Sequence, residues 1–293
     1  AYLDMTLSDK TGEISAKLWS YVPALHGEYS AGDIVKVRGT VSVYNGNDQL
    51  RVEKIRLAVD SDNVYPEDFV KSSDYTGKDM YNELFSVAES FSDSDLKAIV
   101  TTILSENKEA LLYWPAAFKL HHAIRSGLLM HTLSIVRLAQ KVCQVYPFVD
   151  KDLLLAGAIL HDISKISEYD IASSGLATGY TAMGNLVGHL VEGAYIIKST
   201  AQKLGIDSES VMLLQHMVLS HHSEPEFGAA VRPMFIEAEL LSQLDMMDAR
   251  MYEMKEITES TTEKDFSGRI WSMDNRKLYN HGRNNLDERT KLF

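Results

Sequence analysis

The chain has 293 residues, of which 45% are apolar and 24% are charged, and its formal net charge is −12. This composition is typical of a soluble globular protein, and the net charge excludes a protein that coats nucleic acid through its overall field. No apolar run reaches the ~18 residues that span a bilayer, and the sequence begins without a signal-peptide pattern. Cys143 is the only cysteine, which excludes an intrachain disulfide. We therefore expect a cytoplasmic protein of two domains, since one domain takes ~150 residues.

Residues 1–62 alternate between apolar and polar side chains, which is the period of β-strands. Turn sequences such as Ala31-Gly32-Asp33 separate the alternating runs. Short strands of this kind predict a small antiparallel β-barrel. Because the sequence opens directly in a strand, we expect the first strand of the barrel to be absent.

A linker rich in polar residues is expected at 63–80, and beyond it the apolar residues follow helical spacing. This pattern predicts an α+β protein in which an all-α bundle at 81–263 follows the barrel. The expected helices cover about 127–145, 152–161, 183–204 and 208–220, and a long helix follows Pro233. Residues 264–293 form a separate basic segment, with seven basic and four acidic side chains.

The dipeptide His161-Asp162 closes an apolar run at 153–160, where core packing alone does not require an imidazole beside a carboxylate. Further candidate ligands lie on or just after separate predicted helices: His131, His189, His221, His222 and Asp245. Helices that each direct a ligand into a bundle can build a metal site in its core. Nitrogen and oxygen ligands without thiolate suit Mn, Fe, Mg, Co or Zn. Seven candidates exceed the needs of one tetrahedral ion, whereas two ions bridged by Asp162 would use them all.

The order His131…His161-Asp162…Asp245 resembles the metal-dependent HD phosphohydrolase superfamily, and the additional histidines resemble its two-metal members. The segments at 121–132, 155–162, 188–189 and 219–222, together with the barrel segment at 7–19, resemble the YhaM-type 3′→5′ exoribonucleases. That family joins an N-terminal OB-fold to an HD domain, and the resemblance covers essentially the whole chain. One departure is Ser164, which stands where the superfamily commonly has glycine.

This resemblance implies a divalent-metal-dependent hydrolase that shortens single-stranded RNA from its 3′ end. Mn²⁺ is the expected ion, with Fe, Co, Mg and Zn as alternatives. One ion is expected on His131, His161, Asp162 and Asp245, and the other on Asp162, His189 and either His221 or His222. We expect Lys165 to stabilise charge on the phosphoryl oxygens and Arg125 to bind a substrate phosphate. His121 and His122 either line the cleft or are structural, and His216 is expected to pack.

Aromatic and basic residues of the barrel fit a single-stranded nucleic acid, whose bases stack on rings while cations follow its backbone. The candidates are Trp19, Tyr21, Tyr44, Lys36, Arg38 and Arg51. The alternative is that these rings close the barrel or pack on the helical domain. The segments 266–271 and 275–279 also resemble the family, and they either contact RNA, cover the active site or pack.

Two other functions stay open at this point. One is a phosphohydrolase that acts on free nucleotides or cyclic dinucleotides. The other is a non-catalytic RNA-binding adaptor, although a decaying site should have lost at least one of these ligands. The sequence also leaves open whether the protein forms a homo-oligomer.

Overall fold

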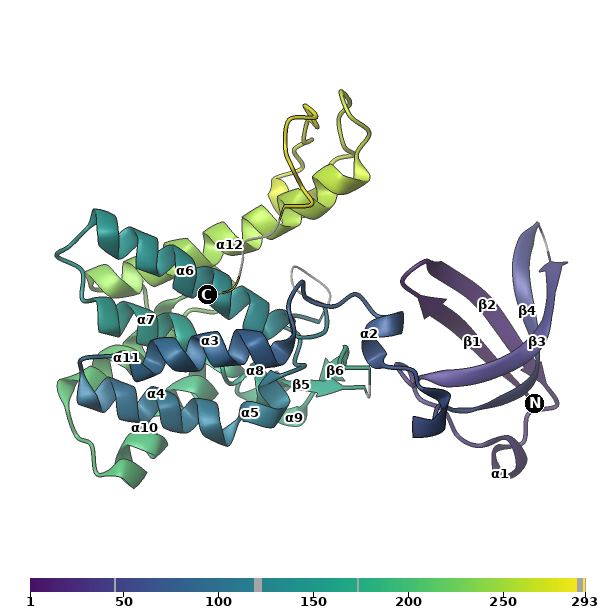
Figure 1. The fold of residues 1–293 in the computed structure, drawn as a ribbon, viewed down its shortest axis with the longest axis horizontal. Helices are drawn as coiled ribbons and strands as arrows, with labels where there is room; N and C mark the ends of the chain where they lie inside the picture. Colours follow the sequence, from purple (N-terminus) through teal and green to yellow (C-terminus); the bar gives the residue numbers. More distant parts are fainter. Residues whose placement is uncertain (45, 119–122, 173, 289–291, 293) are drawn as a thin grey trace.

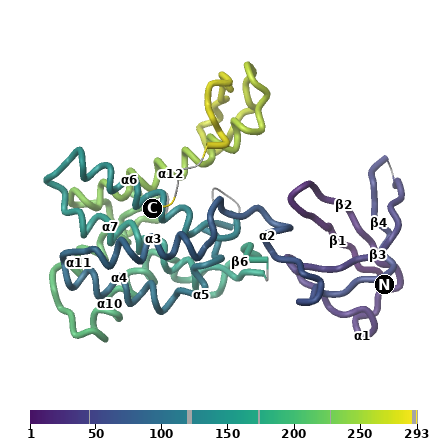
Figure 2. The backbone as a smooth tube through the Cα atoms, viewed as in Figure 1, coloured from purple at the N-terminus to yellow at the C-terminus, as the bar shows by residue number. Residues whose placement is uncertain are grey.

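A computed structural model describes residues 1–44, 46–118, 123–172, 174–288 and 292. A four-stranded sheet at the N-terminus is followed by a bundle of helices, and a short segment after the last long helix completes the chain (Figure 1). The backbone trace in Figure 2 shows the same division into sheet and bundle. The predicted α+β architecture of two domains is therefore confirmed.

The N-terminal sheet contains one parallel strand pair between two antiparallel hairpins. Its strands are β1 (Tyr2–Asp9), β2 (Gly12–Trp19), β3 (Val35–Tyr44) and β4 (Asn47–Leu57), in the spatial order β1-β2-β4-β3. β2 and β4 are the parallel pair. Among the described residues β1 and β3 are edge strands, so the predicted small barrel is an open four-stranded sheet. Its inner face packs around the buried side chains of Ala16, Leu18 and Val52.

The segment between the sheet and the bundle is more ordered than the predicted linker. It contains η1 (Asp60–Asp62) and α2 (Pro66–Phe69). One further short helix, α1 (Pro23–His26), lies earlier in the chain, between β2 and β3. The carboxylate of Asp62 accepts hydrogen bonds from Lys36 at 2.8 Å and from both terminal nitrogens of Arg56, at 2.6 and 2.8 Å. The Arg56 bonds, supported by Lys36 and the Val59 amide, hold the pKa of Asp62 well below its usual range. The Asp62 carboxylate therefore holds η1, the start of the connecting segment, against β3 and β4.

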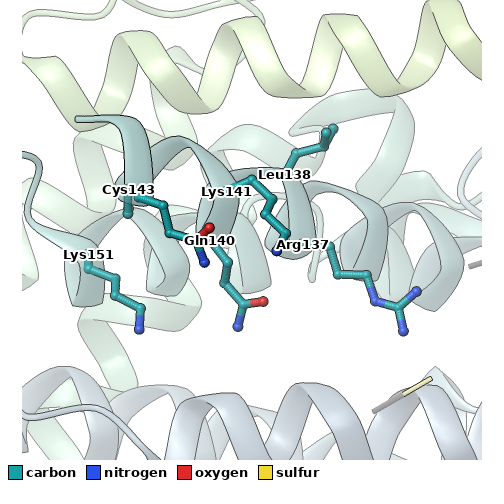
Figure 3. Close-up of a pocket in the computed structure, with 7 residues that line it drawn as sticks. Arg137, Leu138, Gln140, Lys141, Cys143 and Lys151 are labelled. Carbon is teal, nitrogen blue, oxygen red and sulfur yellow. The ribbon is translucent and has the colours of Figure 1, made fainter. Parts of the chain in front are cut away.

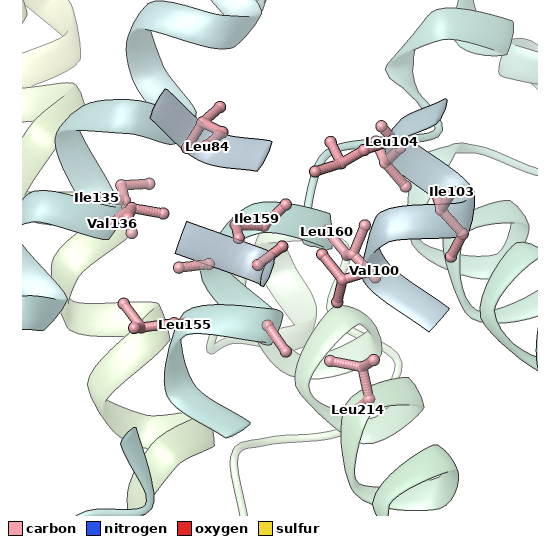
Figure 4. Packing of buried hydrophobic residues seen from close by; sticks show 14 of the residues in the cluster. Leu84, Val100, Ile103, Leu104, Ile135, Val136, Leu155, Ile159, Leu160 and Leu214 are labelled. Carbon is pink, nitrogen blue, oxygen red and sulfur yellow. The ribbon is translucent and has the colours of Figure 1, made fainter. Parts of the chain in front are cut away.

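The bundle is built around α7, whose apolar residues are buried on every side. The helices are α3 (Gly77–Glu89), α4 (Ser94–Glu106), α5 (Lys108–Leu111), α6 (Gly127–Val145), α7 (Lys151–Leu160), α8 (Lys165–Glu168), α9 (Ala182–Leu186), α10 (His189–Leu204), α11 (Glu209–Ser220) and α12 (Ile236–Ser260). α7 packs against α4, α6, α11 and α12. Figure 4 shows this core, in which Ile159 and Leu160 of α7 meet Leu84 and Val100 of the flanking helices. None of the described helices is long and apolar enough to cross a membrane.

The predicted helix at 183–204 is two helices, because Gly188 interrupts it. Gly188 has φ 76°, a left-handed value that a side chain disfavours, and it separates α9 from α10. The break places His189 at the first residue of α10. A two-stranded hairpin, β5 (Tyr169–Ile171) and β6 (Ala177–Tyr180), precedes α9, and the short 3-10 turns η2 (Pro225–Phe227) and η3 (Trp271–Met273) flank α12.

We predict that Asp62→Asn destabilises the protein at pH 7 and that this loss shrinks in acid. The folded state lowers the pKa of Asp62, so its contribution is present above the unfolded value near 3.8 and is lost as the pH falls below it. Thermal unfolding followed by circular dichroism at pH 7 and pH 3 measures both effects. Asp60→Asn, which changes an exposed carboxylate in the same turn, is the matched control. Equal melting temperatures for the two variants at pH 7 would contradict this account.

Candidate metal centre

The bundle brings all seven predicted ligands into one cluster. They are His131 within α6, His161 and Asp162 directly after α7, His189 at the first residue of α10, His221 and His222 directly after α11, and Asp245 within α12. Their potential ligand atoms form groups of three within 4.8 Å of one another. Because α7 and α11 are buried core helices, the residues that follow their last turns are held inside the bundle.

The carboxylate of Asp162 lies between two pairs of histidines. Its Oδ2 atom is 3.3 Å from His161 Nε2 and 3.7 Å from His131 Nε2. Its Oδ1 atom is 3.6 Å from His221 Nε2 and 3.7 Å from His189 Nε2. Each oxygen therefore faces one pair of imidazoles.

Two further ligands extend the two histidine pairs. Asp245 Oδ1 lies 3.1 Å from His131 Nε2, on the side of Asp162 Oδ2. His222 Nε2 lies 3.4 Å from His189 Nε2, on the side of Asp162 Oδ1. The sequence left open which of His221 and His222 contributes, and the structure places both beside His189.

Four of the histidines are oriented through their Nδ1 atoms. In two of them Nδ1 faces a backbone carbonyl of the preceding turn: His161 faces Ala158 at 2.9 Å, and His221 faces Val218 at 2.8 Å. In the other two Nδ1 faces a carboxylate: His131 faces Asp248 at 2.8 Å, and His189 faces Glu168 at 2.9 Å. An Nδ1 that donates to such an acceptor leaves Nε2 as the ligand atom. All four Nε2 atoms point towards Asp162.

The two orienting carboxylates, Asp248 and Glu168, were missed by the sequence analysis. Asp248 follows Asp245 by three residues on α12, so the two side chains share one helix face. That spacing was a usable signal, and it was overlooked. Glu168 carried no comparable signal, because an acidic residue at the end of a short helix is common.

Neighbouring charges set the protonation of His131 and Asp245. Burial alone would lower the pKa of His131, but the carboxylates of Asp245 and Asp248 outweigh it and raise the pKa to about 10. Burial likewise opposes the charge on Asp245, yet the hydrogen bond with His131 holds the pKa of Asp245 well below its usual range. Without a metal, this end of the cluster is therefore an imidazolium held by carboxylates.

The other pKa shifts favour a charged Asp162 and neutral imidazoles at His221 and His222. Burial penalises the Asp162 carboxylate, but Lys165 Nζ at 2.7 Å and His161 keep its pKa well below the usual range. Burial lowers the pKa of His221, and burial together with His221 and His189 lowers the pKa of His222 to about 4. Neutral imidazole and ionised carboxylate are the forms that bind divalent metals.

Two buried polar atoms test whether this donor set fits a cation. Asp162 Oδ1 and His221 Nε2 have no hydrogen-bond partner within the described chain, although they lie 3.6 Å apart. Leaving such atoms unsatisfied costs about 1–3 kcal/mol each, so buried polar atoms usually have partners. A divalent ion coordinated by both would satisfy them. The residues therefore fit a metal site of histidine nitrogen and carboxylate oxygen.

The other predicted site residues lie in different surroundings. The ammonium of Lys165 is nearly buried and bound to Asp162. Arg125 donates to Glu67 Oε1 at 2.7 Å and to the Ser174 carbonyl at 3.3 Å, so its contacts are with α2 and the β5–β6 turn. Its role towards a substrate phosphate stays a prediction. His216 packs on Phe235 with ring centroids 5.2 Å apart, and His121 and His122 lie outside the described residues.

Ser164, the departure from the superfamily pattern, connects the HD dipeptide to α10. It is 1% exposed, and its hydroxyl donates to the backbone carbonyl of His189 at 2.5 Å. Opposite it stands Gly193, where an added methyl group would come within 3.1 Å of Ser164 Oγ. The larger residue in the turn before α8 is thus accommodated by the smallest residue type in α10. This hydrogen bond fixes the residue that carries one of the candidate ligands.

Strand pairing collects the predicted cations of the sheet on its outer face. Lys17 pairs with Arg51, Arg51 pairs with Thr40, and Arg38 and Lys36 follow Thr40 on the same side of β3. Lys36 is bound to Asp62 at 2.8 Å, and Arg38 lies 3.4 Å from Glu53. Arg51 has no ion-pair partner among the residues that the structure describes, so its guanidinium is available to an anion.

The predicted aromatic residues of the sheet differ in exposure. Trp19 is 52% exposed and lies 5.2 Å from the ring of Tyr2, and Tyr44 is 63% exposed. Tyr21 is half-buried against the inner core, and its hydroxyl donates to the Gly27 carbonyl at 2.7 Å. Trp19 and Tyr44 are thus available to a ligand, whereas Tyr21 packs.

Two of the surface hollows of the described structure differ in their surroundings, and both lie outside the cluster. One, of about 610 Å³, is lined by side chains of α6 and the first residue of α7, including Arg137, Lys141 and Cys143 (Figure 3). The other, of about 860 Å³, lies between the sheet and the β5–β6 hairpin, beside Asp9 and Phe69. Neither is lined by a candidate ligand. Burial raises the pKa of the Cys143 thiol, which is half-buried and not reactive by this criterion.

We predict that Ser164→Ala weakens divalent-metal binding about tenfold, because groups that orient ligands contribute 10- to 100-fold to affinity. Titration calorimetry with Mn²⁺ measures the affinity. Ser167→Ala removes a hydroxyl that bonds only the Ser164 carbonyl and is the matched control. Ser164→Thr, which keeps the hydroxyl, should retain more affinity than Ser164→Ala. Unchanged Mn²⁺ affinity in Ser164→Ala would contradict the proposed role.

Comparison with known proteins identifies both domains. The family model described as an HD domain matches residues 128–250, and the one described as an OB-fold nucleic acid binding domain matches residues 2–58. A 3′-5′ exoribonuclease YhaM of Listeria monocytogenes serotype 4b is 36% identical over 279 residues, which cover 95% of this chain and 88% of that protein. The YhaM proteins of Listeria innocua and Listeria welshimeri match to the same extent. No solved structure matches the chain. The resemblance seen in the sequence is confirmed, and the chain belongs to the YhaM family of 3′-5′ exoribonucleases.

Proposed function

We propose that this protein is a divalent-metal-dependent 3′→5′ exoribonuclease that hydrolyses single-stranded RNA. The observation that carries the proposal is the position of Asp162, whose two oxygens each face a pair of histidines. Support for the substrate comes from the relatives, which are named 3′-5′ exoribonucleases, and from the OB-fold nucleic acid binding domain. We further propose a cytoplasmic protein, because its single half-buried cysteine suits a reducing compartment.

Two ions, of which Mn²⁺ is our first choice, would be held on either side of Asp162. His131, His161 and Asp245 would complete one site, and His189, His221 and His222 would complete the other. When bound, such a pair of ions neutralises charge on a phosphodiester and activates water for in-line displacement. The hydrogen bonds at Nδ1 would keep the imidazoles in ligand geometry through each turnover.

Lys165 would keep the Asp162 carboxylate ionised and would place a positive charge beside the substrate phosphate. Its ammonium lies 2.7 Å from Asp162 Oδ2, and mutual attraction raises the pKa of Lys165 in spite of its burial. The group therefore stays protonated at neutral pH. A fixed cation beside the reacting phosphate stabilises the charge that develops on the phosphoryl oxygens.

The outer face of the sheet would bind the RNA upstream of its 3′ end. Arg51 supplies an unpaired cation there, and Trp19 and Tyr44 supply exposed rings. Stacking of bases on such rings tolerates any sequence, because every base has a π-face. This suits an enzyme that removes nucleotides one after another.

We predict that the wild-type protein with Mn²⁺ shortens a 5′-labelled single-stranded RNA stepwise and releases 5′-mononucleotides. Asp162→Ala should reduce this activity to background, because it removes the carboxylate that would hold both ions. Asp170→Ala changes an exposed carboxylate of the nearby β5 strand and should leave the activity unchanged. A denaturing gel of the labelled RNA measures the product ladder over time.

Three outcomes would oppose the proposal. Hydrolysis of free nucleotides or cyclic dinucleotides without shortening of RNA would favour a nucleotide phosphohydrolase. RNA binding without any hydrolysis in the presence of Mn²⁺, Mg²⁺, Co²⁺ or Zn²⁺ would favour an adaptor. Full activity in Asp162→Ala would exclude this metal centre as the catalytic site.

A further inference from the structure

The C-terminal hairpin, residues 264–282, lies outside both family matches and at the far end of α12 (Figure 1). Two isolated antiparallel bridges, Phe266 with Tyr279 and Ile270 with Arg276, define it. The buried residues of α12 all fall between Ala238 and Leu244, so its second half carries the hairpin beyond the core. We propose that this hairpin is a second binding surface for single-stranded RNA; the inference rests on the proposed function.

The hairpin is firmly attached through one of its faces. Asn280 is 8% exposed and donates to the carbonyls of Thr258 and Thr261, at 3.1 and 2.8 Å. These carbonyls belong to the last turn of α12 and to the residue that caps it. Met273 is 2% exposed, and the hydroxyl of Ser272 bonds Glu253 on α12. The hairpin is therefore a fixed surface.

The hairpin exposes three aromatic rings. Trp271 is 85% exposed, Phe266 is 58% exposed and Tyr279 is 46% exposed. The rings of Phe266 and Tyr279 contact each other, with centroids 4.9 Å apart. Trp271 has no ring partner among the described residues. Exposed rings of this kind are stacking platforms for unpaired bases.

The same hairpin carries cations without carboxylate partners among the described residues. Arg269, Arg276 and Lys277 are exposed, and none has an ion-pair partner in the described part of the chain. The guanidiniums of Arg269 and Arg276 bond only backbone carbonyls, those of Asn275 and Met273. The hairpin contains four basic and two acidic residues in a chain of net charge −12. A positive surface with exposed rings is complementary to a single-stranded polyanion with unpaired bases.

The position of the hairpin sets which part of the RNA it contacts. α12 runs without a break from the candidate ligand Asp245 to Ser260, about 22 Å along the helix axis. A dinucleotide in the metal centre is too short to reach the hairpin, whereas a longer strand can contact both. The hairpin should therefore hold upstream nucleotides and affect long substrates selectively.

We predict that Trp271→Ala weakens binding of a single-stranded 20-nucleotide RNA about tenfold, because it removes the ring on which one base would stack. Fluorescence anisotropy in EDTA measures the affinity, since EDTA prevents turnover. Trp271→Phe should recover part of the loss. Phe148→Ala removes another ring that is 70% exposed, in the loop between α6 and α7, and should leave the affinity unchanged.

The salt dependence of RNA affinity tests the contribution of the hairpin cations. Replacing Arg269 and Lys277 with Gln should reduce the slope of log affinity against log salt by about 1.4, at about 0.7 for each phosphate contact of a single strand. Replacing Lys198 and Lys203 on α10 with Gln changes the net charge equally and should leave the slope unchanged. The rate of dinucleotide hydrolysis should be the same in wild type and in all these variants.

The results separate this inference from the proposed function. Wild-type protein that binds the 20-nucleotide RNA but does not shorten it would contradict the exoribonuclease proposal, while the anisotropy data would still decide the role of the hairpin. Wild-type affinity in Trp271→Ala, or an equal loss in Phe148→Ala, would overturn the hairpin proposal. A changed oligomeric state in gel filtration with unchanged RNA affinity would also overturn it, in favour of a surface that binds a second copy of the chain.

Discussion

The centre of this protein depends on one buried carboxylate, that of Asp162, which is placed between two pairs of imidazoles and an ammonium. A buried charge is expensive unless other groups satisfy it. Lys165 satisfies one oxygen, whereas the other has no hydrogen-bond partner in the described chain. A cation is the group that satisfies such an oxygen. The charge balance of the core and the proposed metal chemistry therefore both depend on the Asp162 carboxylate.

The fold holds this carboxylate by directing helix ends towards it. His161 and Asp162 follow the last turn of α7, His221 follows the last turn of α11, and His189 opens α10 after the break at Gly188. A helix end leaves backbone carbonyls without helical partners, and two of the histidines use such carbonyls to fix Nδ1. The architecture of the bundle therefore supplies both the ligands and much of what orients them.

The sequence predicted the two-domain architecture and the residues that converge, because polar residues that close apolar helices have few places to lie other than the core. It did not predict the helix break before His189, since hydrophobic periodicity continues across Gly188 while its positive φ leaves no mark on the pattern. Nor could it show that Arg125 is bound to Glu67, because a pair 58 residues apart depends on the tertiary fold. The three-residue spacing between Asp245 and Asp248 can be seen in the sequence. The contact of Asp248 with His131 cannot, because the two residues are 117 positions apart.

The most direct test of the central claim is a crystal structure of the protein with Mn²⁺, in which anomalous scattering locates the ions. The account predicts two ions ~3.5–4 Å apart, one on each oxygen of Asp162. The ion on the Oδ2 side should contact His131 and Asp245, and the ion on the Oδ1 side should contact His189 and His221. Ions bound elsewhere, or a single ion that does not contact Asp162, would contradict it.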